Sequence, residues 1–301
     1  MQQLIADLRA ARVSNVLPNE ILAHHTTWKI GGPADLMVIP HDKEELLITL
    51  ELLHRHNVSW MVLGRGSNVL VTDKGVRGVV IKLGNGFEHL SFEDQTVRVG
   101  ASFSFIKLSV LAAKRGLTGL EFAGGIPGTV GGAVYMNAGA HGSDVSRILK
   151  SAEVILENGE LVVMNNDQLD FSYRHSLLQE RRGIVTEVVF QLSYGDRLEI
   201  AKAMAANKDR RIHTQPLQMA CAGSVFRNPK PYYAAQLIEE AGLKGTRVGG
   251  AEVSRLHANF IVNTGHATAE DVLAVMEKIQ KTVFEKYGIW LIPEVLVVGE
   301  R

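Results

Sequence analysis

The chain is poor in cysteine and has no surplus of charge of either sign. Cys221 is the only cysteine among 301 residues, which excludes an internal disulfide and a cysteine-rich zinc site. The 32 Lys and Arg residues equal the 32 Asp and Glu residues, so the net charge offers no attraction to nucleic acid or to an anionic membrane surface. The 11 histidines show no His-Glu-x-x-His or comparable ligand spacing. We therefore expect no metal site and no nucleic-acid partner.

Long hydrophobic runs are also missing. The N-terminus reaches a charge at Asp7 before any long apolar stretch, which argues against a secretory signal and makes the cytoplasm the expected location. Residues 122–143 carry no Lys, Arg, Asp or Glu, but seven of these 22 residues are glycine, too many for a hydrophobic membrane span. We expect a loop system here and no association with a membrane.

Glycine, by contrast, is in excess, and the excess is local. Nine of the 29 glycines lie in residues 116–142, where an even spread would put about 2.6. In segments 124–132 and 137–139 this density would let the backbone touch a flat ligand closely, although tight packing of a loop on a helix also uses glycine. The sequence leaves both interpretations open.

Hydrophobic periodicity predicts an α+β chain. Helices are expected at 43–57, 104–115, 197–211 and 232–241, and from a capping box at Thr268 to Gly288. Strands are expected at 58–63, 69–71, 79–83, 96–101, 184–192, 260–263 and 290–298. Residues 152–164 predict a hairpin in which Asn158-Gly159 makes a type I′ turn. The chain changes character at Asp196, and we place a domain boundary there.

The turn Gly64-Arg65-Gly66-Ser67-Asn68 has the composition of an anion-binding nest, in which successive backbone N–H groups converge on one oxygen. A tight β-turn between two strands is the alternative interpretation. Neither Gly-x-Gly-x-x-Gly before a helix nor the P-loop pattern is present, so the Rossmann and P-loop interpretations have no support.

Three further positions are candidates for chemistry. Arg174 follows Tyr173 ahead of a strand and could clamp a carboxylate with its planar fork. Ser224 follows a glycine but lacks the second glycine of a nucleophile elbow, so an acyl-enzyme hydrolase is not predicted. Glu294 interrupts an apolar C-terminal strand, where it is either an edge residue facing water or an active-site carboxylate.

Taken in order, these segments resemble the UDP-N-acetylenolpyruvoylglucosamine reductases, flavoenzymes that complete UDP-N-acetylmuramate for bacterial peptidoglycan. The resemblance spans nearly the whole chain, at residues 27–32, 64–71, 123–142, 173–176, 222–229, 243–245 and 293–295. It implies an FAD-binding fold of the vanillyl-alcohol-oxidase type in residues 1–195, with two α+β subdomains at about 1–95 and 96–195. An α+β substrate-binding domain would follow in residues 196–301, with a C-terminal strand that returns Glu294 to the site.

The resemblance also implies the ligands and the residues that meet them. FAD would bind noncovalently, with NADPH as co-substrate. The residues expected at the cofactor are Gly64, Arg65, Gly66, Ser67, Asn68, Gly124, Gly125, Pro127, Gly128, Thr129, Gly131, Gly132, Asn137, Gly139 and Ile184.

The implied reaction reduces the enolpyruvyl ether of UDP-N-acetylglucosamine to UDP-N-acetylmuramate. Hydride would pass from flavin N5 to the β-carbon of the ether. The match makes Arg174, Ser224 and Glu294 the catalytic residues, with Ser224 as the proton donor. Tyr173, Asn228 and Lys244 would hold the substrate.

Two departures from the family pattern stand out. After Leu192 the chain passes directly into the next helix and lacks the inserted loop whose tyrosine closes the site, so it resembles the shorter class. His141 stands where a tyrosine is usual. The alternatives are another FAD-dependent oxidoreductase of the same fold, or a nucleotide-sugar binding module without activity. The oligomeric state is not determined by the sequence.

Overall fold

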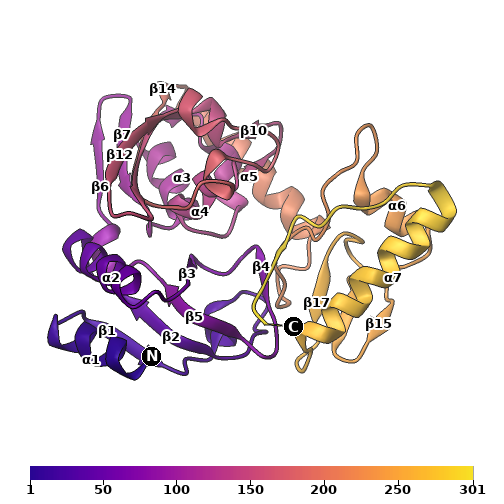
Figure 1. Ribbon diagram of the computed structural model, residues 1–301. Helices are drawn as coiled ribbons and strands as arrows, with labels where there is room; N and C mark the ends of the chain where they lie inside the picture. The colour runs from indigo at the N-terminus through magenta and orange to yellow at the C-terminus, as the bar shows by residue number, and fades with distance from the viewer. Residues whose placement is uncertain (301) are drawn as a thin grey trace. The chain divides into compact units, whose positions relative to one another are not determined.

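The computed structural model describes residues 1–300, which form two compact units (Figure 1). Unit 1 contains Met1–Pro18, Leu36–Arg65 and Gly78–Arg210. Unit 2 contains Asn19–Asp35 and Gly66–Arg77 as well as the C-terminal residues from Arg211 onward. Two segments from the N-terminal half therefore belong to the same unit as the C-terminal residues. The domain boundary at residue 196 remains a prediction.

The first part of unit 1 is a four-stranded sheet next to two helices. The strands run in the order β1 (Asn15–Pro18), β2 (Ala34–Ile39), β5 (Val76–Ile81) and β3 (Trp60–Val62). Helices α1 (Gln2–Ala10) and α2 (Lys43–Arg55) contact each other. Asp42 caps α2, and the helix buries Leu46, Leu50 and Leu53 of the apolar face that its spacing predicts, whereas Leu47, predicted on the same face, is exposed.

The second part of unit 1 is an antiparallel five-stranded sheet. Its order is β12 (Leu161–Asn165), β11 (Leu149–Leu156), β13 (Gly183–Gln191), β7 (Thr96–Gly100) and β6 (Leu90–Glu93). Helices α3 (Phe105–Lys114) and α4 (Val130–Tyr135) supply buried residues to the same core as β7, β11 and β13. Two short pairs complete the unit, namely β8 (Leu117–Thr118) with β14 (Ser193–Tyr194) and β9 (Gly139–Ala140) with β10 (Ser143–Asp144).

The predicted hairpin is present as β11 and β12, but the predicted type I′ turn is wrong. A type I′ turn needs positive φ at both central residues, whereas Gly159 has φ +81° and Asn158 is not in the left-handed region. The Leu156 N–H donates to the Glu160 carbonyl at 2.9 Å, which closes a three-residue loop. The Asn158 side chain accepts from the Glu160 N–H instead, so it supports the turn without itself adopting a positive φ.

Unit 2 is a three-stranded antiparallel sheet with one long helix against it. The strands are β15 (Arg247–Val248), β16 (Ala251–Val253) and β17 (Ile261–Asn263), and α7 (Ala269–Tyr287) lies along β15 and β16 (Figure 1). The predicted capping box at Thr268 and the left-handed Gly288 at the end of α7 are both confirmed. The short helix α6 (Ala234–Glu240) contacts α7, and α5 (Arg197–Thr214) joins the two units in sequence.

The C-terminal strand is shorter than predicted. Strand β18 (Leu296–Val298) pairs in parallel with β4 (Val69–Val71), and Glu294 lies before it instead of inside it. Pro293 forms an isolated antiparallel bridge with Phe226, which places residues 292–295 beside a different segment from the one that β18 meets. The other predicted helices and strands are present with ends shifted by a few residues. No helix within residues 1–300 has both the length and the apolar character needed to cross a membrane.

Candidate functional site

The turn at residues 64–68 is shaped by close contacts that only glycine allows. Gly66 has φ +64°, and a Cβ there would lie 2.3 Å from the His25 carbonyl oxygen. A Cβ on Gly64 would lie 2.9 Å from Oγ1 of Thr129, so two of the predicted cofactor residues are neighbours within unit 1. The bare backbone at Gly64 is therefore required by its surroundings, as a phosphate-binding turn would need.

Side chains of unit 2 hold the second half of this turn. Thr27 donates its backbone N–H to the Gly66 carbonyl at 3.1 Å and its hydroxyl to the Cys221 carbonyl at 2.7 Å. The Asn68 amide donates to the Glu294 carbonyl at 3.2 Å. The structure thus brings Asn68 beside Glu294, which is 226 residues away in sequence.

Glu294 is bonded to the segment that carries Ser224. The Glu294 N–H donates to the carbonyl of Val225, the residue after Ser224, at 2.7 Å. The Asn259 side chain grips the next residue, accepting from the Phe226 N–H at 2.9 Å and donating to the Phe226 carbonyl at 2.8 Å. Both predicted catalytic residues are partly buried, and Asn259 fixes the backbone two residues after Ser224. No motif in the sequence indicated Asn259.

The two predicted substrate residues of unit 2 have partners within the protein. Lys244 forms an ion pair with Glu239 at 2.6 Å, and the Asn228 side chain accepts from the Ala234 N–H at 3.0 Å. Burial and the nearby charge of Lys244 lower the pKa of His257, which keeps this imidazole neutral at pH 7. His257 was not predicted, because an isolated histidine carries no spacing signal.

Arg174 adopts an unusual conformation in unit 1. The N–H and carbonyl groups of Ser172 and His175 bond each other at 3.2 Å and close a tight turn, in which Arg174 has φ +58°. This left-handed region disfavours a long side chain, and such strain concentrates at functional sites. The guanidinium donates to the Gly139 carbonyl at 2.7 Å and lies 5.0 Å from the centre of the Tyr173 ring.

The same turn is attached to the glycine-rich segment through Asn137. The Asn137 amide donates to the Ser172 carbonyl at 2.9 Å, and its oxygen accepts from the Ser146 N–H at 3.0 Å. Tyr173, Arg174, Asn137 and Gly139 were predicted separately from distant segments, and the structure joins them in one cluster.

Several glycines of segment 124–139 serve packing within the protein. A Cβ on Gly131 would lie 3.0 Å from Ala101 Cβ, and one on Gly139 would lie 2.6 Å from Asp144 Cβ. A Cβ on Gly124 would lie 3.4 Å from its nearest neighbours, which is an ordinary van der Waals contact. Thr129 caps α4 by accepting from the Gly132 N–H at 3.2 Å. Packing therefore explains part of the glycine excess, as the alternative interpretation of the sequence allows.

The remaining predicted cofactor positions lie in three different environments. Gly125 is buried, Pro127 is exposed, and the Gly128 carbonyl accepts from the Phe105 N–H at 3.1 Å. The Ile184 side chain is 2% exposed and belongs to the hydrophobic core. The side chain of Ile184 is therefore not available to a ligand.

A lysine that the sequence did not indicate follows β5. Leu63 donates to the Ile81 carbonyl at 2.8 Å, which places Lys82, the next residue, near Gly64 and Arg65. Burial and the charge of Arg65 lower the pKa of Lys82. A positive cluster beside the turn is the arrangement that a phosphate group would use.

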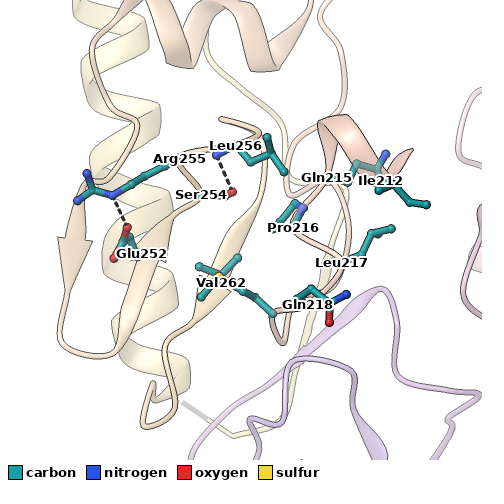
Figure 2. Close-up of a pocket in the computed structure, with 11 residues that line it drawn as sticks. Ile212, Gln215, Pro216, Leu217, Gln218, Glu252, Ser254, Arg255, Leu256 and Val262 are labelled. Atoms are coloured by element: carbon teal, nitrogen blue, oxygen red, sulfur yellow. Dashed lines mark hydrogen bonds and ion pairs between the residues drawn. The ribbon is translucent and has the colours of Figure 1, made fainter. Parts of the chain in front are cut away.

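A cavity of about 410 Å³ lies within unit 2 (Figure 2). Its lining comes from the end of α5 and the loop after it, and from β16, β17 and the turn between them. Ile212, Leu217 and Leu256 give it apolar walls, and Arg255 is held by Glu252 at 3.2 Å. A pocket of this size and character can hold a small ring compound. Within residues 1–300 no group of three His, Cys, Asp or Glu side chains is arranged to hold a metal ion.

Two family models match the chain. A model described as "UDP-N-acetylenolpyruvoylglucosamine reductase, C-terminal domain" matches residues 215–298, and one described as "FAD binding domain" matches residues 34–165. The UDP-N-acetylenolpyruvoylglucosamine reductase of Halalkalibacterium halodurans is 54% identical to this chain over 301 residues, which covers 100% of both chains.

Solved structures agree with these matches. The crystal structure of UDP-N-acetylenolpyruvylglucosamine reductase from Thermus caldophilus has a TM-score of 0.81 and 38% identity, covering 94% of this chain and 98% of that chain. A berberine bridge enzyme variant, a reticuline dehydrogenase, has a TM-score of 0.51 and 14% identity, covering 64% of this chain and 44% of that one. This last likeness concerns the fold alone. The predicted fold class, an FAD-binding fold followed by an α+β C-terminal part, is confirmed.

Proposed function

Because the chain belongs to the UDP-N-acetylenolpyruvoylglucosamine reductase family and is an FAD-dependent oxidoreductase, we propose that it uses NADPH to reduce the enolpyruvyl ether of UDP-N-acetylglucosamine. The product is UDP-N-acetylmuramate, a precursor of peptidoglycan. The observation that carries the proposal is the hydrogen bond from the Glu294 N–H to the carbonyl of Val225, which joins the segment of this carboxylate to the segment of the proposed proton donor, Ser224.

The residues present fit FAD. The turn 64–68 offers backbone N–H groups to a pyrophosphate, and a side chain at Gly64 or Gly66 would collide with Thr129 or His25. Lys82 and Arg65 add positive charge beside this turn. FAD, when bound, supplies to the β-carbon of the enolpyruvyl group a hydride that originates from NADPH.

Arg174 stabilises the charge that develops on the substrate. Addition of hydride to the β-carbon leaves an electron pair on the α-carbon, next to the carboxylate, so negative charge spreads over an enolate. A guanidinium fixed by its turn and by the Gly139 carbonyl presents two parallel N–H donors to those oxygens. Tyr173 lies against the guanidinium and helps to orient it.

Ser224 donates the proton that completes the reduction at the α-carbon. A hydroxyl is a weak acid, but a carbanion held within hydrogen-bond reach is basic enough to take its proton. Glu294, whose backbone is bonded to the carbonyl of Val225, the residue after Ser224, steadies this proton path. Asn228 and Lys244 hold oxygens or phosphates of the sugar nucleotide from unit 2.

The test separates two half-reactions under anaerobic conditions. We expect NADPH to bleach the flavin of both the wild type and Ser224→Ala, and we expect the enolpyruvyl substrate to reoxidise only the wild type efficiently. The matched control is Ser193→Ala, at an exposed serine of β14, which should behave as the wild type does. Normal turnover of Ser224→Ala would overturn the role of this serine as proton donor. A purified wild-type protein without flavin absorbance would contradict the proposed function altogether.

A further inference from the structure

Arg227 occupies a rigid position between Ser224 and Asn228 that the proposed mechanism does not use. Its backbone N–H donates to the Ile292 carbonyl at 2.9 Å. The preceding residue, Phe226, is bonded on both sides by the Asn259 side chain and bridges Pro293. The backbone of Arg227 is therefore held in place.

One N–H of the Arg227 guanidinium, at Nε, has no partner. Its Nε is sealed from solvent, and no residue among 1–300 offers it a hydrogen-bond acceptor. Nε of Arg227 is the one buried side-chain nitrogen or oxygen in this condition among the described residues. A buried polar N–H without a partner is costly, more so when it belongs to a charged group, and arginine stays charged in proteins.

The chemistry of this group indicates what its partner is. The Nε–H and the adjacent Nη–H point in parallel and match two oxygens of one phosphate or carboxylate. Lys244, the other cation assigned to the substrate in this unit, is already paired with Glu239. The neighbouring residue, Asn228, is assigned to the same sugar nucleotide.

We propose that Arg227 binds the pyrophosphate of the sugar-nucleotide substrate, leaving its unsatisfied position when the substrate arrives. The inference rests on the proposed function, because that function supplies a pyrophosphate at unit 2. A substrate-binding Arg227 and a purely structural Arg227 differ in what the loss of the side chain would do. Removal of the guanidinium should weaken substrate binding while relieving the free protein of a buried unpaired donor.

The experiment compares Arg227→Met with Arg227→Lys and with Arg247→Met, a control at a half-exposed arginine of the same unit. For Arg227→Met we expect the KM for the enolpyruvyl substrate and the Kd for UDP to rise about 10- to 100-fold, the range for loss of a charge-assisted contact. Its thermal midpoint should stay equal to or above that of the wild type. Arg227→Lys should recover part of the affinity, and Arg247→Met should leave KM and Kd unchanged.

Other outcomes would overturn the proposal in distinct ways. Unchanged KM and Kd in Arg227→Met, or a lowered thermal midpoint with unchanged binding, would make Arg227 a structural residue. A raised KM with unchanged binding of UDP, which lacks the carboxylate, would assign the contact to the carboxylate instead of the pyrophosphate. Failure of the wild type to bind UDP or to turn over the substrate would contradict the proposed function itself, and the Arg227 contact with it.

Discussion

At the scale of single residues, the motif around Arg174 predicts its role, but its backbone conformation depends on the fold. The motif Tyr173-Arg174-x-Ser176 predicts which residue meets the substrate carboxylate. The left-handed backbone of Arg174 was not predictable, because it depends on the closure of the Ser172–His175 turn and on the Gly139 carbonyl 35 residues away. The side chain is therefore held in advance of binding, which reduces the cost of orienting it in the reaction.

Replacement of Arg174 by lysine should abolish most turnover. A lysine keeps the charge but cannot present two parallel donors, so we expect kcat for reduction of the enolpyruvyl substrate to fall roughly 100-fold or more. Flavin reduction by NADPH should be unaffected in a single-turnover measurement. Arg181→Lys, at an exposed arginine nearby in sequence, is the control. Unchanged kcat in Arg174→Lys would remove the two-point contact from the mechanism.

At the scale of elements, the start of α7 is held by side chains from its own first turn and from a distant segment. The Asp271 carboxylate accepts from the Gly250 N–H at 3.0 Å and from the Thr268 N–H at 3.1 Å. Asp73 accepts from the Ala269 and Glu270 N–H groups at 2.8 Å and 3.0 Å. The capping box was predictable because its partners are three residues apart, whereas the contribution of Asp73 comes from almost 200 residues away.

Loss of the Asp271 carboxylate should destabilise unit 2 in a pH-dependent way. The bonds from Gly250 and Thr268 lower the pKa of Asp271 from its ordinary value of 3.8. The stabilisation is therefore fully present above about pH 4 and is lost as the pH falls through the lowered pKa. Asp271→Ala should lower the free energy of unfolding by about 1 kcal/mol at pH 7. This difference from the wild type should shrink as the pH falls below the ordinary pKa of 3.8.

Urea unfolding of the wild type and Asp271→Ala at several pH values measures this difference. Glu270→Ala removes a carboxylate from the same helical turn, and this exposed residue is the matched control. It should cost less than Asp271→Ala at every pH. If the difference in the free energy of unfolding between the wild type and Asp271→Ala stayed constant down to about pH 2.5, that result would contradict the lowered pKa.

At the scale of the whole molecule, the core of unit 2 depends on residues from the N-terminal half. Trp28 is 0% exposed and lies in the same core as Val272 and Ile279 of α7. Its indole N–H donates to the Ile261 carbonyl at 2.8 Å, and the Asn263 amide donates to the Trp28 carbonyl at 3.0 Å. Residues 211–301 alone therefore lack part of their own core.

Truncation of Trp28 should lower the denaturant concentration at which unit 2 unfolds. Trp28→Ala removes a large buried ring and a hydrogen bond, and we expect a loss of about 3–5 kcal/mol in the free energy of unfolding. Trp290→Ala is the matched control, because Trp290 is 51% exposed and packs on Phe284 at the surface. It should cost well under half as much. Equal costs for the two variants would show that Trp28 does not join the N-terminal segment to the core.

The helices, the strands and the chemical types of the site could be predicted from the chain without its fold. Helix spacing, the Thr268 cap, the Gly288 end and the order of motifs depend on residues a few positions apart, so they can be read without a fold. The residues proposed for the reaction, Arg174, Ser224 and Glu294, were identified by the resemblance of their segments to a known family. The turn type at Asn158-Gly159 and the length of the last strand were wrong, because pairing with other segments decided them.

Which segments share a core, and which of the described side chains lack partners, became known from the folded structure. It assigned residues 19–35 and 66–77 to unit 2, bonded Glu294 to Val225, and held Phe226 with Asn259. It also left Nε of Arg227 buried and unpaired. The physical reason is that a buried hydrogen bond or charge depends on every atom that surrounds it, and those atoms come from residues tens to hundreds of positions apart.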